Sequence, residues 1–145
     1  LNSDNSHYEH FGHDYEILSM VAHAYHLKDI SGKFPCSMSI PRLQAAEGCK
    51  GLQSNDVDDN RYALYHAVLK LAVPDSRLII TRRESAEMMD RLRPMINIED
   101  LATRPGVGGN YRTGTNFQNK LGDTRTSPEI IQGVRDKGYV AKIVV

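Results

Sequence analysis

The sequence RLIITRRE, residues 77–84, decides the fold class. It is a short apolar run followed directly by two arginines and an acid, as expected of a strand that is buried on both faces and ends at a polar sheet edge. Helical periodicity precedes it at 57–72 and follows it at 84–92. A buried strand between two helices is the unit from which parallel α/β folds are built.

Upstream of this run, the chain holds a polar segment, one more helix and one more strand. The polar segment covers 1–13, and Asp14 is the expected N-cap of a helix that Gly32 ends. The strand at 36–40 stops at Pro41, because proline has no N–H to give to a neighbouring strand. Each upstream helix carries an apolar stripe expected to face the core. The stripes are Ile17, Leu18, Val21, Ala22 and Tyr25 in the first helix, and Leu64, Ala67, Val68 and Leu71 in the second.

Downstream of the run, the pattern predicts a strand, a long loop, a helix and a final strand. The strand is expected at 95–98, and residues 103–125, rich in Gly, Asn, Thr and Arg, predict the loop. Ser127 is the expected N-cap of the last helix, and Gly138 ends it. The β-branched stretch 139–145 predicts the final strand.

The alternation of strands and helices implies a parallel sheet with right-handed crossovers. At 145 residues the chain is long enough for one domain. A complete (β/α)8 barrel needs about 250 residues and is excluded. The pattern alone leaves two architectures open, namely half of a TIM-type barrel and a small doubly wound domain.

Composition narrows the class of partner. Basic and acidic residues both number 18, so the formal charge is zero and gives no electrostatic reason to expect nucleic acid or an anionic membrane. No apolar run approaches the roughly 18 residues of a membrane span. Cys36 and Cys49 form neither a disulfide framework nor a C-x-x-C pair, and two sparse thiols fit a reducing cytoplasm, with one structural disulfide as the alternative. A soluble cytoplasmic protein is expected.

Ligands of parallel α/β proteins bind beyond the C-terminal ends of the strands. Arg82 and Arg83 follow a strand directly, and the planar guanidinium group suits a carboxylate or a phosphate. Thr81 offers a hydroxyl to the same anion. The alternative is that these arginines pair with acids such as Glu84 or Glu87.

Two other motifs favour ordinary surface roles. Several histidines recur in three-residue steps, whereas helical metal sites more often use four-residue spacing, so solvated side chains are expected at His7, His10, His13, His23 and His26. The glycines at 106–109 lack both the Walker lysine and the G-x-G-x-x-G spacing. They therefore favour a loop over a nucleotide site.

Six stretches resemble, in the same order, the radical S-adenosylmethionine lyases that act on aromatic amino acids. They are HAYHL at 23–27, SMSIPRL at 37–43, LKLAVP at 69–74, IITRRES at 79–85, GGNY at 108–111 and GDTR at 122–125. The family includes the tyrosine lyase of thiamine biosynthesis, the tyrosine lyase of [FeFe]-hydrogenase maturation and related tryptophan lyases. The hydrogenase-maturase branch matches the first helix best.

This resemblance implies a fold, a reaction and a site. The fold is α/β, with parallel βα units forming the C-terminal half of a TIM-type barrel as one domain over 1–145. The reaction is cleavage of the Cα–Cβ bond of tyrosine by a 5′-deoxyadenosyl radical made from S-adenosylmethionine at a [4Fe-4S] cluster. Arg83 and Thr81 would hold the substrate carboxylate, with Arg82 beside them. Pro41, Arg42 and Leu43 would lie on the S-adenosylmethionine side.

The family's C-x-x-x-C-x-x-C motif, which binds the cluster, is absent from this sequence, and neither Cys36 nor Cys49 can replace its three thiolates. The first hypothesis is therefore the C-terminal portion of such a lyase, with the N-terminal barrel half or a second chain as partner. The second is a non-catalytic half-barrel that binds or assembles without a cluster. The third is a small doubly wound domain that binds an anion at Arg82 and Arg83.

Overall fold

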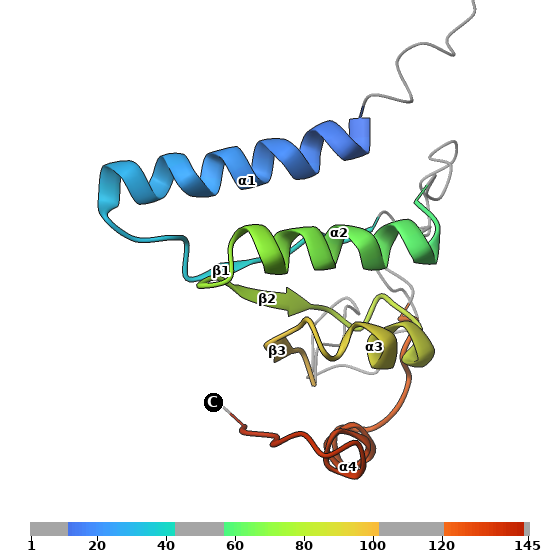
Figure 1. Ribbon diagram of the computed structural model, residues 1–145. Helices are drawn as coiled ribbons and strands as arrows, with labels where there is room; N and C mark the ends of the chain where they lie inside the picture. Colours follow the sequence, from blue (N-terminus) through green and yellow to red (C-terminus); the bar gives the residue numbers. More distant parts are fainter. Residues whose placement is uncertain (1–11, 43–56, 102–120, 144–145) are drawn as a thin grey trace, which may run out of the picture. The chain divides into compact units, whose positions relative to one another are not determined.

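The computed structural model describes residues 12–42, 57–101 and 121–143, and within them strands and helices alternate as predicted (Figure 1). The expectations for Leu43, Cys49, two of the histidines, the 106–109 glycines and most of the long loop lie outside these residues. The elements are α1 (Gly12–Ser31), β1 (Ser37–Met38), α2 (Asp59–Ala72), β2 (Arg77–Ile80), α3 (Ala86–Leu92), β3 (Ile98–Glu99) and α4 (Ser127–Asp136).

The three strands form one sheet in the order β1-β2-β3. β1 and β2 are parallel, with Ser37 opposite Arg77 and Met38 opposite Leu78. On the other side of β2, the Leu78 carbonyl accepts from the Asn97 N–H at 2.9 Å and the Ile80 carbonyl from the Asp100 N–H at 3.3 Å. Donors and acceptors advance along the chain together, which is the pattern of a parallel pair. The predicted parallel α/β class is confirmed.

The strand predicted at 95–98 is shorter than expected and begins later, at Ile98. Asn97 explains this difference, because its side-chain oxygen accepts a hydrogen bond that a backbone carbonyl would accept in a regular strand pair. Its Oδ1 accepts from the Leu78 N–H at 3.2 Å and from the Lys70 ammonium at 3.1 Å.

The chain divides into two compact units that interleave along the sequence. The first unit consists of residues 1–40, 56–79 and 92–98, and the second of residues 41–55, 80–91 and 99–145. The division falls at the C-terminal end of β2. The first unit therefore contains most of the sheet, and the second contains the polar residues that follow β2.

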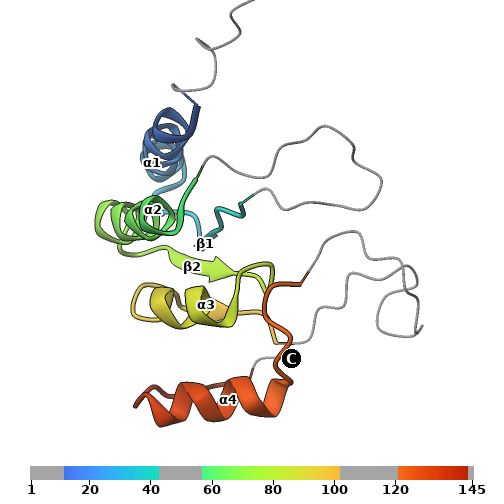
Figure 2. The same cartoon turned by 90° about the vertical axis from the view of Figure 1, so that its right-hand side faces the viewer.

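In the first unit, α1 lies alongside α2 and runs in the same direction (Figures 1 and 2). Near the start of both helices the Asp14 carboxylate accepts from the Tyr65 hydroxyl at 2.5 Å and from Arg61 Nη2 at 2.6 Å. Near their ends the Tyr25 hydroxyl donates to the Ala72 carbonyl at 3.1 Å. The predicted N-cap role of Asp14 is wrong, because α1 already begins at Gly12 and the carboxylate binds α2 instead.

Of the apolar stripes predicted for these helices, Ile17 is buried as expected, but none of the other positions is buried. Leu64 and Leu71 of α2 are 58% and 82% exposed, and Leu18 of α1 is 64% exposed. Aromatic and imidazole side chains take the buried face of α2, since their polar tips find partners. The Tyr62 hydroxyl donates to the Ile40 carbonyl at 3.0 Å, and the His66 Nδ1 lies 3.0 Å from the Tyr62 carbonyl. The buried residues are Tyr62, Tyr65, His66 and Leu69 in α2, and Ile17 and Ala24 in α1.

In the second unit, α4 has the predicted limits but a different cap. The N-cap is Thr126, whose N–H and hydroxyl donate to the Glu129 carboxylate at 2.6 and 2.7 Å. The predicted cap, Ser127, is the first helical residue, and its hydroxyl donates to the Leu101 carbonyl at 2.8 Å. Gly138 ends the helix with a φ of +81°, as expected of a glycine C-cap.

The strand predicted at 139–145 is not formed over 139–143, the part that the structure describes. Tyr139, Val140 and Ile143 are 41%, 95% and 60% exposed. A β-branched sequence becomes a strand only where a neighbouring strand accepts its backbone hydrogen bonds, so propensity alone was insufficient here.

Candidate functional site

The residues Thr81 to Glu84 directly follow β2, where the sequence predicts a ligand site. Their burial differs from one residue to the next. Arg82 and Glu84 are 8% and 3% exposed, whereas Thr81 and Arg83 are half-buried. Two charged side chains at this depth require partners, because a buried charge without a partner is costly.

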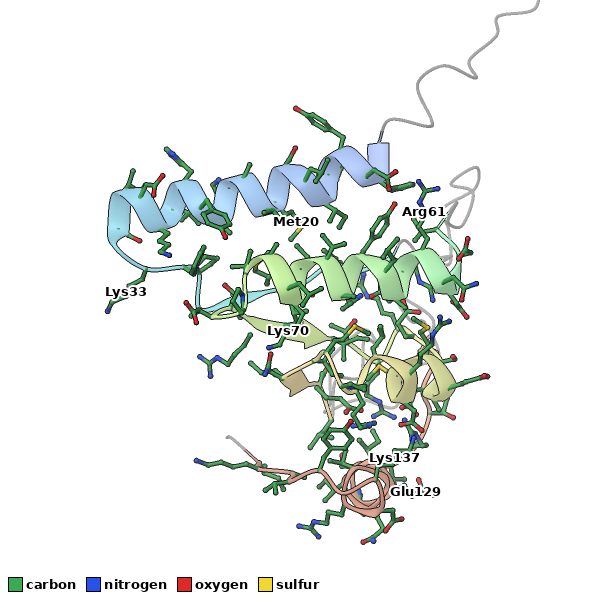
Figure 3. The ribbon with its side chains drawn as sticks, viewed as in Figure 1. Met20, Lys33, Arg61, Lys70, Glu129 and Lys137 are labelled. Carbon is green, nitrogen blue, oxygen red and sulfur yellow. The ribbon has the colours of Figure 1, made fainter. Side chains whose placement is uncertain are left out.

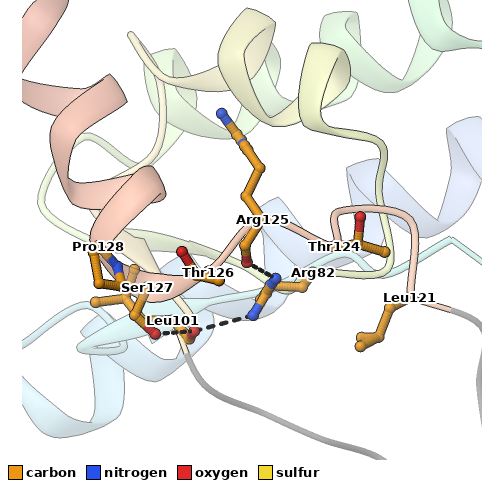
Figure 4. Close-up of a pocket in the computed structure, with 8 residues that line it drawn as sticks. All are labelled: Arg82, Leu101, Leu121, Thr124, Arg125, Thr126, Ser127 and Pro128. Atoms are coloured by element: carbon orange, nitrogen blue, oxygen red, sulfur yellow. Dashed lines mark hydrogen bonds between the residues drawn. The ribbon is translucent and has the colours of Figure 1, made fainter.

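Arg82 binds backbone, not an acid. Its Nη1 donates to the Leu101 carbonyl at 3.1 Å, and its Nη2 donates to the carbonyls of Asp123, at 2.9 Å, and Arg125 (Figure 4). Its own carbonyl accepts from the N–H groups of Gly122 and Asp123 at 3.0 and 3.2 Å. Arg82 therefore ties two later segments of the chain to the end of β2, an arrangement that the sequence analysis did not predict.

Gly122 lies directly on the strand end. A Cβ added there would be 2.5 Å from the Arg83 carbonyl oxygen and from the carbonyl carbon and oxygen of Glu84. No side chain fits in that space, and the neighbouring atoms are backbone atoms that cannot rotate away. The glycine therefore allows the 121–126 segment to approach the backbone of the two residues that follow Arg82.

The next residue, Asp123, is fully buried and bound by Arg125. Its carboxylate accepts from the Arg125 N–H at 2.9 Å, from Nε at 3.0 Å and from Nη2 at 2.6 Å. Burial acts to raise the pKa of Asp123, but the hydrogen bonds from Arg125 outweigh it and lower that pKa. Arg125 also lies 3.5 Å from the Asp90 carboxylate on α3, which binds Lys137 at 2.6 Å. These ion pairs connect α3 to residues that flank α4 on its two sides.

Glu84 pairs with Arg42, a residue of the other predicted motif. Arg42 Nε donates to Glu84 Oε1 at 3.2 Å, and Nη2 donates to Oε2. The side chains of Arg42 and Glu84 are only 12% and 3% exposed. The structure thus brings together two motifs that are 42 residues apart in the sequence, and Glu84 does not pair with Arg82 or Arg83 as the alternative interpretation expected.

Arg83 differs from its three charged neighbours. Among the residues that the structure describes, no hydrogen bond or ion pair engages its guanidinium group. Thr81 likewise has no side-chain partner within the described ranges. Of the predicted site residues, Arg83 is therefore the cation whose planar donor group remains available to a carboxylate or phosphate.

A cavity of about 400 Å³ lies beside Arg82 (Figure 4). Its wall combines two arginines, three hydroxyl side chains and apolar groups, and Arg83 is not part of it. The lining residues are Arg82, Leu101, Leu121, Thr124, Arg125, Thr126, Ser127 and Pro128.

The part of the chain that the structure describes contains no group of three His, Cys, Asp or Glu side chains placed to hold a metal. The rings of His23 and His26 are 6.4 Å apart on an exposed face of α1, and Cys36 is an exposed free thiol. No helix within the described ranges is both long enough and apolar enough to cross a membrane.

Comparison with known proteins gives matches among solved structures alone. No family model matches the chain, and no curated protein matches it. The X-ray structure of the FeFe-hydrogenase maturase HydG from Carboxydothermus hydrogenoformans superimposes with a TM-score of 0.79 and 30% sequence identity over 90% of this chain. A second crystal structure of HydG, a maturase of the [FeFe]-hydrogenase, gives 0.80 and 28% over 88% of this chain.

The chain is similar to HydG. The resemblance predicted from the six stretches is thereby confirmed. This chain spans 30% of the first HydG chain and 28% of the second, so it corresponds to less than a third of either protein.

The sequence predicted the residues at the end of β2 but not most of the residues that bind them. The roles of Gly122 and Asp123 are visible in the sequence only as a family-like GDTR stretch, and no pattern indicated that both bind the backbone of Arg82. The Arg42–Glu84 pair had a signal, namely one arginine and one acid that follow two neighbouring parallel strands.

Proposed function

We propose that this chain is the C-terminal portion of a radical S-adenosylmethionine lyase that cleaves tyrosine, of the hydrogenase-maturase type. The identity of 28–30% to HydG over about nine-tenths of the chain supports this proposal, as does the shared order of the six motifs. The chain would contribute the parallel βα units of one half of a TIM-type barrel. The remaining units, in the same protein or in a second chain, would complete a cytoplasmic enzyme.

The single observation that carries the proposed role is the availability of Arg83. It follows a buried strand directly, and within the described residues its guanidinium group has no partner. By contrast, Arg82, Arg42 and Glu84 all have hydrogen-bond partners. In this proposal Arg83 binds the carboxylate of the aromatic amino acid through two parallel hydrogen bonds, and the Thr81 hydroxyl adds a third. Arg82 belongs to the same site because it fixes the backbone from which Arg83 extends.

A firm hold on the carboxylate is what such a reaction demands of this part of the protein. A hydrogen atom can be removed selectively only from a substrate whose reacting bond is fixed in distance and direction. A bidentate arginine restricts both, since it allows one orientation of the carboxylate plane. The proposed contribution of this chain is therefore to bind and orient the amino acid.

The residues described here do not fit an iron–sulfur cluster, because they offer one thiol, Cys36, and no group of three ligands. No step assigned to this chain runs through the cluster. Pro41, Arg42 and Leu43 are proposed to face S-adenosylmethionine, with Arg42 already engaged by Glu84 and Leu43 outside the described residues.

A second candidate function has its own support. Within the ranges that the structure describes, β1 and β3 are the two edge strands of the sheet, and α2 exposes Leu64 and Leu71. Unpaired strand edges and exposed apolar side chains are typical of surfaces that another chain covers. The alternative is therefore a non-catalytic half-barrel that assembles with a partner. Size-exclusion chromatography with light scattering tests it, and a stable monomer would argue against it.

The decisive experiment measures the affinity of the full chain for L-tyrosine and for L-tyrosine amide, which lacks the carboxylate. The wild-type chain should bind the acid more tightly than the amide, and Arg83→Ala should abolish this difference in affinity. Arg135→Ala, an exposed arginine of α4, is the control and should bind as the wild type. Unchanged tyrosine binding by Arg83→Ala would reject the proposed role.

The wider proposal has an independent test. A parent reading frame that encodes C-x-x-x-C-x-x-C upstream of Leu1 would support the lyase over the assembly module. Unrelated coding sequence in that position would reject a lyase encoded in a single reading frame.

A further inference from the structure

The buried pair Arg42–Glu84 lies next to the arginine that the proposed function uses. We infer that Arg42 is a positioning residue: by holding the Glu84 carboxylate, it keeps the neighbouring Arg83 guanidinium open for the carboxylate of the substrate. This inference rests on the proposed function and adds to it a residue on a different strand end.

Glu84 is a strong competitor for Arg83. Its side chain is 3% exposed, so water cannot replace a lost partner, and leaving a buried carboxylate without a cation is strongly unfavourable. Arg83 precedes it directly in the chain and has no other partner among the described residues. Without Arg42, Arg83 is the cation that a buried Glu84 would recruit, and this internal pair would occupy the donors proposed to bind substrate.

The geometry of the observed pair prevents this. Arg42 donates to both oxygens of Glu84, through Nε at 3.2 Å and through Nη2, which is the two-point arrangement that a guanidinium and a carboxylate prefer. Each carboxylate oxygen is thus engaged by the side chain from the β1 strand end. The Arg42 side chain is itself only 12% exposed, so solvent competes little with the pair.

The backbone around Arg83 is held in place independently. Gly122 leaves no room for a Cβ against the carbonyls of Arg83 and Glu84, and the carbonyl of Arg82 accepts two hydrogen bonds from Gly122 and Asp123. Arg82 is therefore bound through both its side chain and its backbone, and Glu84 is bound through its side chain. The backbone of Arg83 is held in place while its guanidinium group has no partner among the described residues. Less conformational entropy is therefore lost when a ligand binds.

The inference makes a prediction that a purely structural role for Arg42 does not make. If Arg42 acts by occupying Glu84, then removing the Glu84 charge should make Arg42 dispensable. Arg42→Ala should weaken tyrosine binding by about tenfold or more, because Glu84 then competes for Arg83. The double variant Arg42→Ala/Glu84→Gln should recover most of that loss, although it contains one more substitution.

The experiment measures binding of L-tyrosine and L-tyrosine amide to the full chain by titration calorimetry, with folding checked by circular dichroism. The ratio of the two affinities is the informative quantity, because a variant that merely lowers the folded fraction reduces both signals and leaves the ratio unchanged. Arg61→Ala is the matched control: it also removes an arginine from a carboxylate pair, but in the first unit and at 49% exposure. It should leave the ratio unaltered.

The outcomes separate this inference from the proposed function. If Arg83→Ala abolishes discrimination and Arg42→Ala does not reduce it, the inference is wrong and the proposed function stands. The inference is equally wrong if Arg42→Ala loses discrimination and the double variant does not regain it. If Arg83→Ala binds as the wild type, or the wild type does not discriminate, both proposals fail.

Where Arg42→Ala does not fold, Arg42→Lys replaces it. Lysine retains the charge but offers a point contact in place of the fork, so it should release Glu84 in part and weaken tyrosine binding to an intermediate degree. Recovery on addition of Glu84→Gln would support the inference. Wild-type discrimination by Arg42→Lys alone, with no further change on adding Glu84→Gln, would overturn it.

Discussion

Two of the arginine–carboxylate pairs that join separate segments of the chain, Asp14–Arg61 and Arg42–Glu84, differ in how deeply their side chains are buried. Asp14–Arg61 joins α1 to α2 with side chains 56% and 49% exposed, whereas Arg42–Glu84 joins two strand ends with side chains 12% and 3% exposed (Figure 3 labels Arg61 at the start of α2). Water and salt compete for the first pair and not for the second. The same pair of groups therefore holds two helices together weakly in one region and joins the segments that follow β1 and β2 firmly in the other.

The largest expected effect tests how tightly the strand-end region is built. Gly122→Ala should destabilise the chain by about 3 kcal/mol, because its Cβ would lie 2.5 Å from backbone atoms that cannot move away. Gly133→Ala, within α4, is the matched control. Its Cβ would be 3.8 Å from the nearest atom, and alanine favours a helix, so it should stabilise by about 0.5–1 kcal/mol. Urea unfolding of both variants measures the difference, and equal effects would contradict this account.

The next effect concerns the buried carboxylate of the same region. Asp123→Asn should cost about 2–3 kcal/mol at neutral pH, since Arg125 loses a fully buried ionic partner. The pKa of Asp123 is lowered in the folded state, where burial opposes ionisation and the Arg125 hydrogen bonds outweigh it. Its stabilisation is therefore complete above the unfolded-state pKa of about 3.9 and is lost as the pH falls through the lower folded pKa.

Unfolding free energies measured from pH 6 to pH 3 check this prediction. The variant should show a flatter decline than the wild type. Parallel curves would mean that Asp123 does not contribute through its charge.

A smaller effect is expected in the exposed region. The pKa of Asp14 is lowered, first by the hydrogen bond from Tyr65 and then by the bond from Arg61. The contribution of Asp14 to stability is therefore also complete only at pH values above the ordinary pKa of an aspartate. Arg61→Ala should reduce stability by less than Asp123→Asn does, and this loss should vanish in 1 M salt, where exposed pairs are screened. A loss that persists in high salt would show that the pair is better shielded than its exposure indicates.

The smallest effect checks which face of α2 is buried. Leu71→Gln should change stability by no more than about 0.5 kcal/mol, because this side chain is 82% exposed. Leu69→Ala, two residues away and fully buried, should cost about 2–5 kcal/mol. Comparable losses from the two variants would mean that the burial of α2 is reversed.

The sequence predicted the order of elements, the parallel pairing and the end of β2 as the place for a site. It predicted these because a buried strand, a strand ended by proline and a helix ended by glycine are local patterns. It did not predict the faces of α1 and α2, since the stripe was read from aliphatic residues and the buried positions of α2 include Tyr62, Tyr65 and His66. These side chains are buried only because Ile40, Asp14 and the Tyr62 carbonyl bind their polar atoms.

The different contacts of Arg82 and Arg83 could not be predicted from local sequence patterns, for a related reason. The two residues are identical and adjacent, and both follow the same strand. They differ because Leu101 and the 121–126 segment form hydrogen bonds with Arg82. These tertiary contacts leave no pattern in the sequence near residue 82. The same holds for Asp14, which has the sequence of a cap and the contacts of an inter-helix bridge.

The Arg82 contacts have a consequence for how relatives of this chain can vary in length. Leu101 and Gly122 precede and follow a stretch of chain, and both are bound to Arg82. When the two ends of a segment are anchored at one residue, doubling its length adds only about 0.6 kcal/mol of closure entropy. The stretch between these anchors can therefore gain or lose residues during evolution, while the arginine beside the anchor keeps its position.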